Sequence, residues 1–116
     1  PLLQLMSVAG GPVDRPDLTY AAMATPAGLA AVAGYARWIG VETAMVAPDA
    51  GRAPTSLIAD AHAAGLKVAA WTFRAEPAFL PPGAADLTAW LTAFRTFGLD
   101  AAFSDFPAAA VAVAAL

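Results

Sequence analysis

The sequence predicts an α/β fold of parallel βα units, arranged as the second half, about four strands, of a TIM-type (β/α)8 barrel. The first observation behind this prediction is a series of four short apolar segments, separated by loops and by segments with helical features. The second is that only 13% of the 116 residues are charged, against about 25% in a typical soluble domain, which leaves little charge for a solvated surface. An open four-stranded doubly wound sheet is the alternative.

The first predicted strand covers residues 2–6, LLQLM, in which a polar residue, Gln4, interrupts the apolar run. The Gly and Pro pairs that follow predict a loop. We expect this loop to end at Thr25, which can cap a helix that has Pro26 at its first position. The helix itself is predicted over residues 27–38, where small side chains allow close packing against a sheet.

The second predicted strand covers residues 39–46 and is followed by a turn-rich loop. Thr55 or Ser56 can cap the next helix, which we expect to run through Ala64, with Gly65 just past its end. The apolar stripe of this helix is formed by Leu57, Ile58 and Ala61.

The third predicted strand covers residues 66–73, and a long loop with three prolines follows it at residues 74–85. Asp86 is placed to cap a helix over residues 87–97, which Gly98 ends. One face of this helix collects its large apolar side chains, Leu87, Trp90, Leu91 and Phe94.

The fourth predicted strand covers residues 99–103, and a last Ala- and Val-rich helix is expected beyond Asp105, with Pro107 in its first turn. Short helix-to-strand turns and long strand-to-helix loops are typical of folds that bind ligands at the carboxyl ends of their strands. The chain opens at Pro1 directly into a strand-like run. We therefore interpret residues 1–116 as one part of a single longer barrel domain whose amino-terminal half is absent, which would leave both sheet edges without partners.

Composition excludes several classes of function. The formal net charge is −3 and the Lys and Arg residues are scattered, which argues against a nucleic-acid partner. Cysteine is absent, so disulfides and thiolate chemistry are excluded. No transmembrane segment is expected, because the longest apolar run, residues 108–116, is too short to span a bilayer. The phosphate-binding Gly loop, the nucleophile elbow and the HExxH motif are also missing from the sequence.

Three residues are candidates for substrate binding. Gln4 must find partners inside an apolar strand, either across a barrel interior or in a pocket. Trp71 ends a buried strand, where it is either a core aromatic or the wall of a small-ligand pocket. Arg74 follows on the loop and suits a phosphate group, with a loop salt bridge as the structural alternative.

Other polar residues have simpler interpretations. His62 is the single histidine and lies within a predicted helix, so we expect a structural or solvent-facing role. Asp105 suits helix capping, with a site role as the alternative, and Glu76 lies on the same loop as Arg74. Asp49 and Asp60 are expected to be solvated.

Taken together, residues 61–76 (AHAAGLKVAAWTFRAE) and 97–111 (FGLDAAFSDFPAAAV) resemble the carboxyl-terminal part of the glycerophosphodiester phosphodiesterases. The opening residues PLLQLM look like strand five of such proteins, and residues 34–41 (GYARWIGV) look like the approach to strand six. The resemblance covers essentially the whole chain and is most similar to a periplasmic or secreted branch.

The resemblance implies an eight-stranded barrel enzyme that hydrolyses glycerophosphodiesters, small-molecule substrates, to glycerol 3-phosphate and an alcohol. It implies a divalent metal, calcium or magnesium, held by carboxylates, and two histidines that act as acid and base. These groups belong to the first half of such a barrel, so no catalytic residue and no metal ligand is expected in this chain, and the chain alone is expected to be inactive. Periplasmic or secreted location follows from the branch, with the cytoplasm as the alternative.

By the same resemblance, Gln4, Trp71 and Arg74 match positions on the rim of the substrate pocket, and Asp105 matches the Asp of the terminal Asp-Phe-Pro signature. The chain departs from the family in having Ala69-Ala70 where a His-Pro or His-Val pair is frequent, and Val41 where Pro is common. A non-catalytic, degenerate barrel that serves as a binding or structural module is therefore the alternative function.

Overall fold

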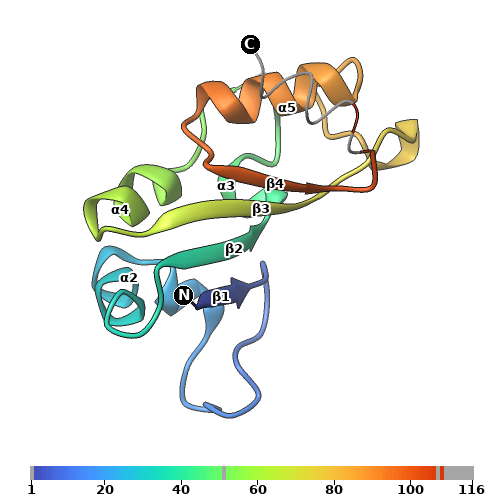
Figure 1. Ribbon diagram of the computed structural model, residues 1–116. Helices are drawn as coiled ribbons and strands as arrows, with labels where there is room; N and C mark the ends of the chain where they lie inside the picture. The colour runs from blue at the N-terminus through green and yellow to red at the C-terminus, as the bar shows by residue number, and fades with distance from the viewer. Residues whose placement is uncertain (1, 51, 107, 109–116) are drawn as a thin grey trace.

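The structure is a computed structural model that describes residues 2–50, 52–106 and 108. Within this part of the chain, four strands form one sheet in the order β1-β2-β3-β4, and every neighbouring pair is parallel. The strands are β1 (Leu3–Met6), β2 (Trp38–Glu42), β3 (Lys67–Phe73) and β4 (Ala101–Ser104). Figure 1 shows them side by side in chain order, with α5 running along the β4 side of the sheet. The predicted alternation of parallel strands with helices is confirmed.

The connections between the strands contain short helices. They are α1 (Tyr20–Met23), α2 (Pro26–Val32), α3 (Thr43–Val46), α4 (Leu57–Ala63), the 3-10 turn η1 (Pro77–Phe79) and α5 (Leu87–Thr96). Among the described residues, no helix is long and apolar enough to cross a membrane.

The caps predicted for α2 and α5 and the glycine predicted after α4 are confirmed, whereas Ser56, at the start of α4, makes no side-chain capping bond. The Thr25 Oγ1 atom accepts a hydrogen bond from the Gly28 amide at 3.1 Å, and Asp86 Oδ1 accepts one from the Ala89 amide at 2.7 Å. These bonds satisfy amides that have no partner inside the helix. Gly65, just past the end of α4, has a φ of +83°, a conformation that a side chain would strain.

Two boundaries differ from the prediction by several residues. The helix predicted over residues 27–38 ends at Val32, because the amides of Arg37 and Trp38 already donate to the Leu2 carbonyl and the chain has joined the sheet. The strand predicted over residues 39–46 ends at Glu42 and continues as α3. Packing overrides β propensity there, since Val46 is fully buried and its carbonyl accepts from the Thr55 amide at 2.8 Å.

One observed helix was not predicted, and one predicted helix lies mostly outside the described residues. The short helix α1 was not predicted, and it begins where Thr19 Oγ1 accepts a hydrogen bond from the Ala22 amide at 3.1 Å. The last predicted helix falls on residues that, apart from Phe106 and Ala108, lie outside the described part of the chain.

One face of the sheet is packed against the helices. Met6 on β1 is in register with Val41 on β2, and Val41 with Ala70 on β3, and all three are fully buried. Phe73 joins this core after a register shift in β3, and its ring lies 4.6 Å from Trp90 and 5.3 Å from Phe94, measured between centroids. The helices contribute the residues predicted to be apolar stripes, namely Leu57, Ile58, Ala61, Leu87, Trp90, Leu91 and Phe94.

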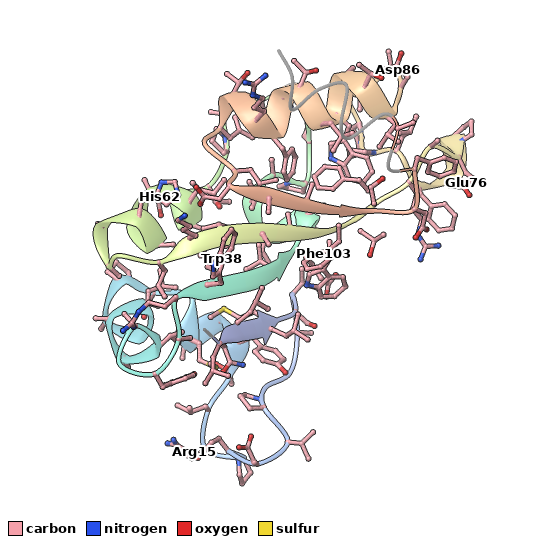
Figure 2. All side chains as sticks on the ribbon, in the orientation of Figure 1. Arg15, Trp38, His62, Glu76, Asp86 and Phe103 are labelled. Carbon is pink, nitrogen blue, oxygen red and sulfur yellow. The ribbon has the colours of Figure 1, made fainter. Side chains whose placement is uncertain are left out.

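The other face of the sheet, which we call the open face, has no helix packed on it in the described chain. Residues on this face alternate with the core residues along each strand. They are Leu3, Leu5, Trp38, Gly40, Glu42, Lys67, Ala69, Trp71, Ala101 and Phe103. Figure 2 labels Trp38 and Phe103, which lie over the strands and away from α5. The described fold is thus four consecutive parallel strands joined by short helices, with one covered and one uncovered face, as in half of a (β/α)8 barrel.

Candidate functional site

The carboxyl ends of the four strands meet at one edge of the sheet, because all strands point the same way. Ser7 and Val8 follow β1, Glu42 ends β2, Arg74 follows β3 and Asp105 follows β4. We call these residues, together with Trp71, the mouth. Barrel enzymes place their substrates at this edge.

Trp71 lies on the open face near the mouth, in register with Glu42 on the neighbouring strand. It is partly buried and does not belong to the core packed beneath the helices. Its indole Nε1 atom is inaccessible to solvent and has no hydrogen-bond partner among the described residues. A buried donor without a partner costs about 1–3 kcal/mol, so a group that accepts from this N–H would be favourable. Trp71 therefore has the position that a pocket wall requires, and its role in binding stays a prediction.

Arg74 is held at the mouth by two contacts. Its Nε atom lies 3.5 Å from Asp105 Oδ2, and its guanidinium carbon lies 4.7 Å from the centre of the Phe79 ring. Both charged side chains are exposed, and exposed ion pairs of this kind contribute about 0–1 kcal/mol. The loop salt bridge that the sequence offered as the structural alternative is thus present. It is weak, and it uses only one of the five N–H donors of the Arg74 guanidinium. Phosphate binding by Arg74 stays a prediction.

Gln4 is separated from Trp71 and Arg74, because it lies on the helix-covered face in register with the buried Ile39. Its Oε1 atom accepts a hydrogen bond from the Tyr35 hydroxyl at 2.7 Å, and its Nε2 atom donates to the Leu5 carbonyl at 2.9 Å. This arrangement ties β1 to the turn that follows α2. The amide is satisfied inside the chain, so it needs no substrate to meet its hydrogen-bonding capacity.

Sequence reasoning missed Glu42 as a mouth residue. Its Oε1 atom accepts a hydrogen bond from the Val8 amide at 3.2 Å, which fixes the start of the loop after β1. The signal available in the sequence was a carboxylate directly after an apolar run. We predicted that the strand continued through this position, and so the edge was placed four residues too late.

Ser104 links the carboxyl ends of β3 and β4 through hydrogen bonds. Its hydroxyl donates to the Phe73 carbonyl at 3.0 Å and accepts from the Phe106 amide at 3.0 Å. The Asp105 amide also lies 3.4 Å from the Phe73 carbonyl. These bonds fix the backbone on which Arg74 and Asp105 face each other.

His62 lies far from the mouth, at the amino ends of the strands. Its Nε2 atom is 2.7 Å from Asp100 Oδ2, and the same oxygen accepts from the Val68 amide at 2.8 Å. This cluster joins α4 to the starts of β3 and β4, as the expected structural role of His62 requires. In the part of the chain that the structure describes, no group of three His, Asp or Glu side chains could hold a metal ion. The described residues therefore do not fit the implied metal, and no chemical step here passes through one.

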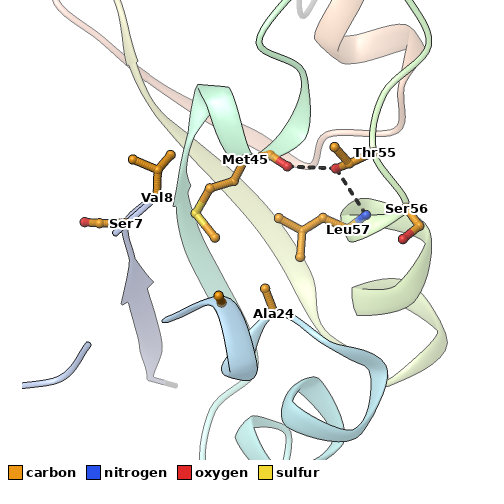
Figure 3. A pocket seen from close by; sticks show the side chains of 8 residues that line it. Ser7, Val8, Ala24, Met45, Thr55, Ser56 and Leu57 are labelled. Carbon is orange, nitrogen blue, oxygen red and sulfur yellow. Dashed lines mark hydrogen bonds between the residues drawn. The ribbon is translucent and has the colours of Figure 1, made fainter. Parts of the chain in front are cut away.

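A pocket of about 350 Å³ opens beside the mouth, between the loop after β1, α1 and the start of α4 (Figure 3). Its polar atoms are largely engaged: Thr55 Oγ1 donates to the Met45 carbonyl at 2.7 Å, and Ser56 Oγ bonds Asp60 Oδ2 at 2.8 Å. The lining residues are Ser7, Val8, Ala21, Ala24, Met45, Thr55, Ser56 and Leu57. None of the three predicted substrate residues lines this pocket.

No protein-family model matches the chain, and no curated protein matches it either. Among solved structures, the chain is similar to a candidate glycerophosphoryl diester phosphodiesterase from Silicibacter pomeroyi DSS-3, with a TM-score of 0.58 and 20% sequence identity. The match covers 94% of this chain and 28% of that chain, so this chain spans less than a third of the similar protein. The expected resemblance is thereby supported at the level of structure. The described chain thus has the fold of four consecutive parallel strands with their connecting helices, as in part of a (β/α)8 barrel.

Proposed function

We propose that this chain is part of a phosphodiesterase that hydrolyses glycerophosphodiesters to glycerol 3-phosphate and an alcohol. The observation that supports the proposal most strongly is the position of Trp71 and Arg74 near the carboxyl edge of a barrel-type sheet. The fold similarity to a candidate glycerophosphoryl diester phosphodiesterase supports the same class of reaction. In this reaction a water oxygen forms a bond to phosphorus, the bond from phosphorus to the alcohol oxygen breaks, and the alcohol leaves with a proton.

The residues of this chain would bind and orient the substrate. Arg74 would place its free N–H groups against the phosphoryl oxygens, because a guanidinium forms paired, charge-assisted hydrogen bonds with such groups. Trp71 would pack its indole against the apolar surface of the glycerol part. Glu42 would keep the loop after β1 in place through its bond to the Val8 amide.

The remaining groups would come from βα units that complete the barrel. These units would carry the two histidines and the carboxylates that hold calcium or magnesium, a metal that neutralises charge on phosphoryl oxygens when bound. We propose a periplasmic or secreted location for such an enzyme, on the resemblance to that branch alone.

The proposal is tested by measuring hydrolysis of glycerophosphodiesters by the protein that contains this chain together with its upstream sequence. Arg74→Ala should lower kcat/KM at least about tenfold, since a hydrogen bond to a charged group contributes about 1.5–3 kcal/mol. Arg15→Ala is the matched control, because Arg15 also forms an exposed pair with an Asp, at 2.8 Å, on the distant loop after β1. Equal activity of the two variants would contradict the role of Arg74.

The 116-residue chain alone should show no turnover. Metal-dependent turnover by this chain would contradict the proposal that the catalytic histidines and the metal-binding carboxylates lie in other βα units. A longer protein that folds but hydrolyses none of these substrates would support the alternative, a non-catalytic barrel that binds or supports other molecules.

A further inference from the structure

Glu42 lies at the mouth with most of its hydrogen-bonding capacity unused. Its Oε1 atom accepts from the Val8 amide at 3.2 Å, and the side chain makes no other hydrogen bond and no ion pair within the described residues. Glu42 is also the N-cap residue of α3, yet its side chain does not cap that helix. An ionised carboxylate has about four acceptor sites. The second oxygen, Oε2, of this partly buried side chain is therefore left for a donor outside the described chain.

Trp71 is the neighbour of Glu42 on the open face. The two residues are partners in the parallel strands β2 and β3, so their side chains leave the sheet on the same side, from backbones about 4.8 Å apart. An indole gives a rigid apolar surface, and a carboxylate accepts hydrogen bonds. A ligand that suits both groups has carbon atoms to pack on the indole and a hydroxyl group to donate to the carboxylate.

The charges at the mouth differ from one strand to the next. Glu42 ends β2 and is negative, whereas Arg74 follows β3 and is positive. A phosphoryl group offers acceptor oxygens and negative charge, so Arg74 attracts it and Glu42 repels it. A glycerol hydroxyl is a neutral donor, which a carboxylate accepts. The two charged groups thus match the two chemically different ends of a glycerol phosphate ester.

We propose that Glu42 selects the glycerol part of the substrate by accepting a hydrogen bond from one of its hydroxyl groups at Oε2. In this arrangement Trp71 packs on the glycerol carbons and Arg74 holds the phosphoryl group. The inference rests on the proposed function, because it assumes that a glycerophosphodiester occupies the mouth. It adds a reason for preferring glycerol, since a site that binds a hydroxyl group discriminates against an analogue without one.

The structural alternative is that Glu42 only fixes the loop after β1 through its bond to the Val8 amide. Glu42→Gln separates the two roles. The amide oxygen of Gln can still accept from the Val8 amide, so the loop is expected to stay in place. The negative charge is lost, however, and a neutral amide binds a hydroxyl group more weakly than a carboxylate does.

The experiment is isothermal titration calorimetry of the protein that contains this chain together with its upstream sequence. The probes are glycerol 3-phosphate and propyl phosphate, which share the phosphate group and the three-carbon chain and differ by two hydroxyl groups. The wild-type protein should bind glycerol 3-phosphate at least about tenfold more tightly. Glu42→Gln should lower this ratio at least about fivefold and should leave the Kd of propyl phosphate unchanged or lower.

Two further variants serve as controls. Glu76→Gln removes the same charge from an exposed position on the loop after β3, which Figure 2 labels, and should leave the ratio unchanged. Trp71→Ala should weaken both probes by a similar factor, because both have a carbon chain to pack on the indole. Circular dichroism of each variant checks that the fold is intact.

The proposal is overturned by a wild-type protein that binds the two probes equally or binds neither. It is also overturned by a Glu42→Gln variant with an unchanged ratio, which would leave Glu42 with its loop bond alone. Failure of the proposed function has a different result. In that case the protein hydrolyses no glycerophosphodiester but still distinguishes the two probes through Glu42.

Discussion

Trp71 and Phe73 lie two residues apart in β3 yet belong to opposite faces of the sheet, and this difference can be measured as stability. Phe73 is fully buried and contacts Trp90 and Phe94, so Phe73→Ala should lower the free energy of unfolding by about 3–5 kcal/mol. For a domain of this size, that loss corresponds to a fall in Tm of roughly 12–20 °C. Trp71→Ala should cost less than about 1.5 kcal/mol, because the loss of partly buried indole surface is offset by removal of a buried N–H without a partner.

The measurement is urea unfolding followed by far-ultraviolet circular dichroism. Both substitutions are made in the same protein and compared at one protein concentration, so that association would contribute equally to the two results. A Trp71→Ala variant that loses as much stability as Phe73→Ala would refute the assignment of Trp71 to the open face. It would place the indole in the core and remove the basis for a pocket wall.

Three smaller predictions concern single interactions. Asp86→Ala should destabilise the chain by about 1 kcal/mol in urea unfolding, because it removes the cap on the Ala89 amide, and an unchanged midpoint would contradict this. Gly65→Ala should also cost about 1 kcal/mol, entirely through its φ of +83°, since an added methyl group there meets no atom within 4 Å. The hydrogen bond from Arg15 lowers the pKa of Asp17, so the stability it adds is present above the ordinary Asp pKa and is lost as the pH falls. Arg15→Ala should raise the pKa of Asp17 toward its ordinary value, and an NMR titration that finds no change would contradict that cause.

The strongest sequence patterns predicted the fold correctly. The helical spacing of Leu87, Trp90, Leu91 and Phe94 and the Asp86 cap located α5, because burial and capping act on the same residues. The apolar run at 66–73 located β3 for a similar reason. The boundary between β2 and α3 could not be located from the sequence. It depends on the hydrogen bond from the Thr55 amide to the Val46 carbonyl, and Thr55 lies on a loop whose position the sequence does not show.

The placement of the candidate residues was predicted only in part, and the reason is geometric. A strand sequence shows that Gln4 is polar among apolar residues, but it does not show which face of the sheet Gln4 occupies. That choice depends on its partner Tyr35, which is 31 residues away. The positions of Trp71 and Arg74 were easier to predict, because both residues lie at a strand end that the preceding apolar run locates.

The contact between Arg74 and Asp105 would affect how readily the product leaves in the proposed reaction. A glycerophosphodiester carries one negative charge, whereas a phosphate monoester carries about 1.5 to 2 at neutral pH. A lone arginine would thus hold the product more tightly than the substrate and slow the next turnover. Asp105, 3.5 Å from the guanidinium, competes for that cation at every stage. An acidic neighbour of this kind favours departure of the product, at the expense of some affinity for the incoming diester.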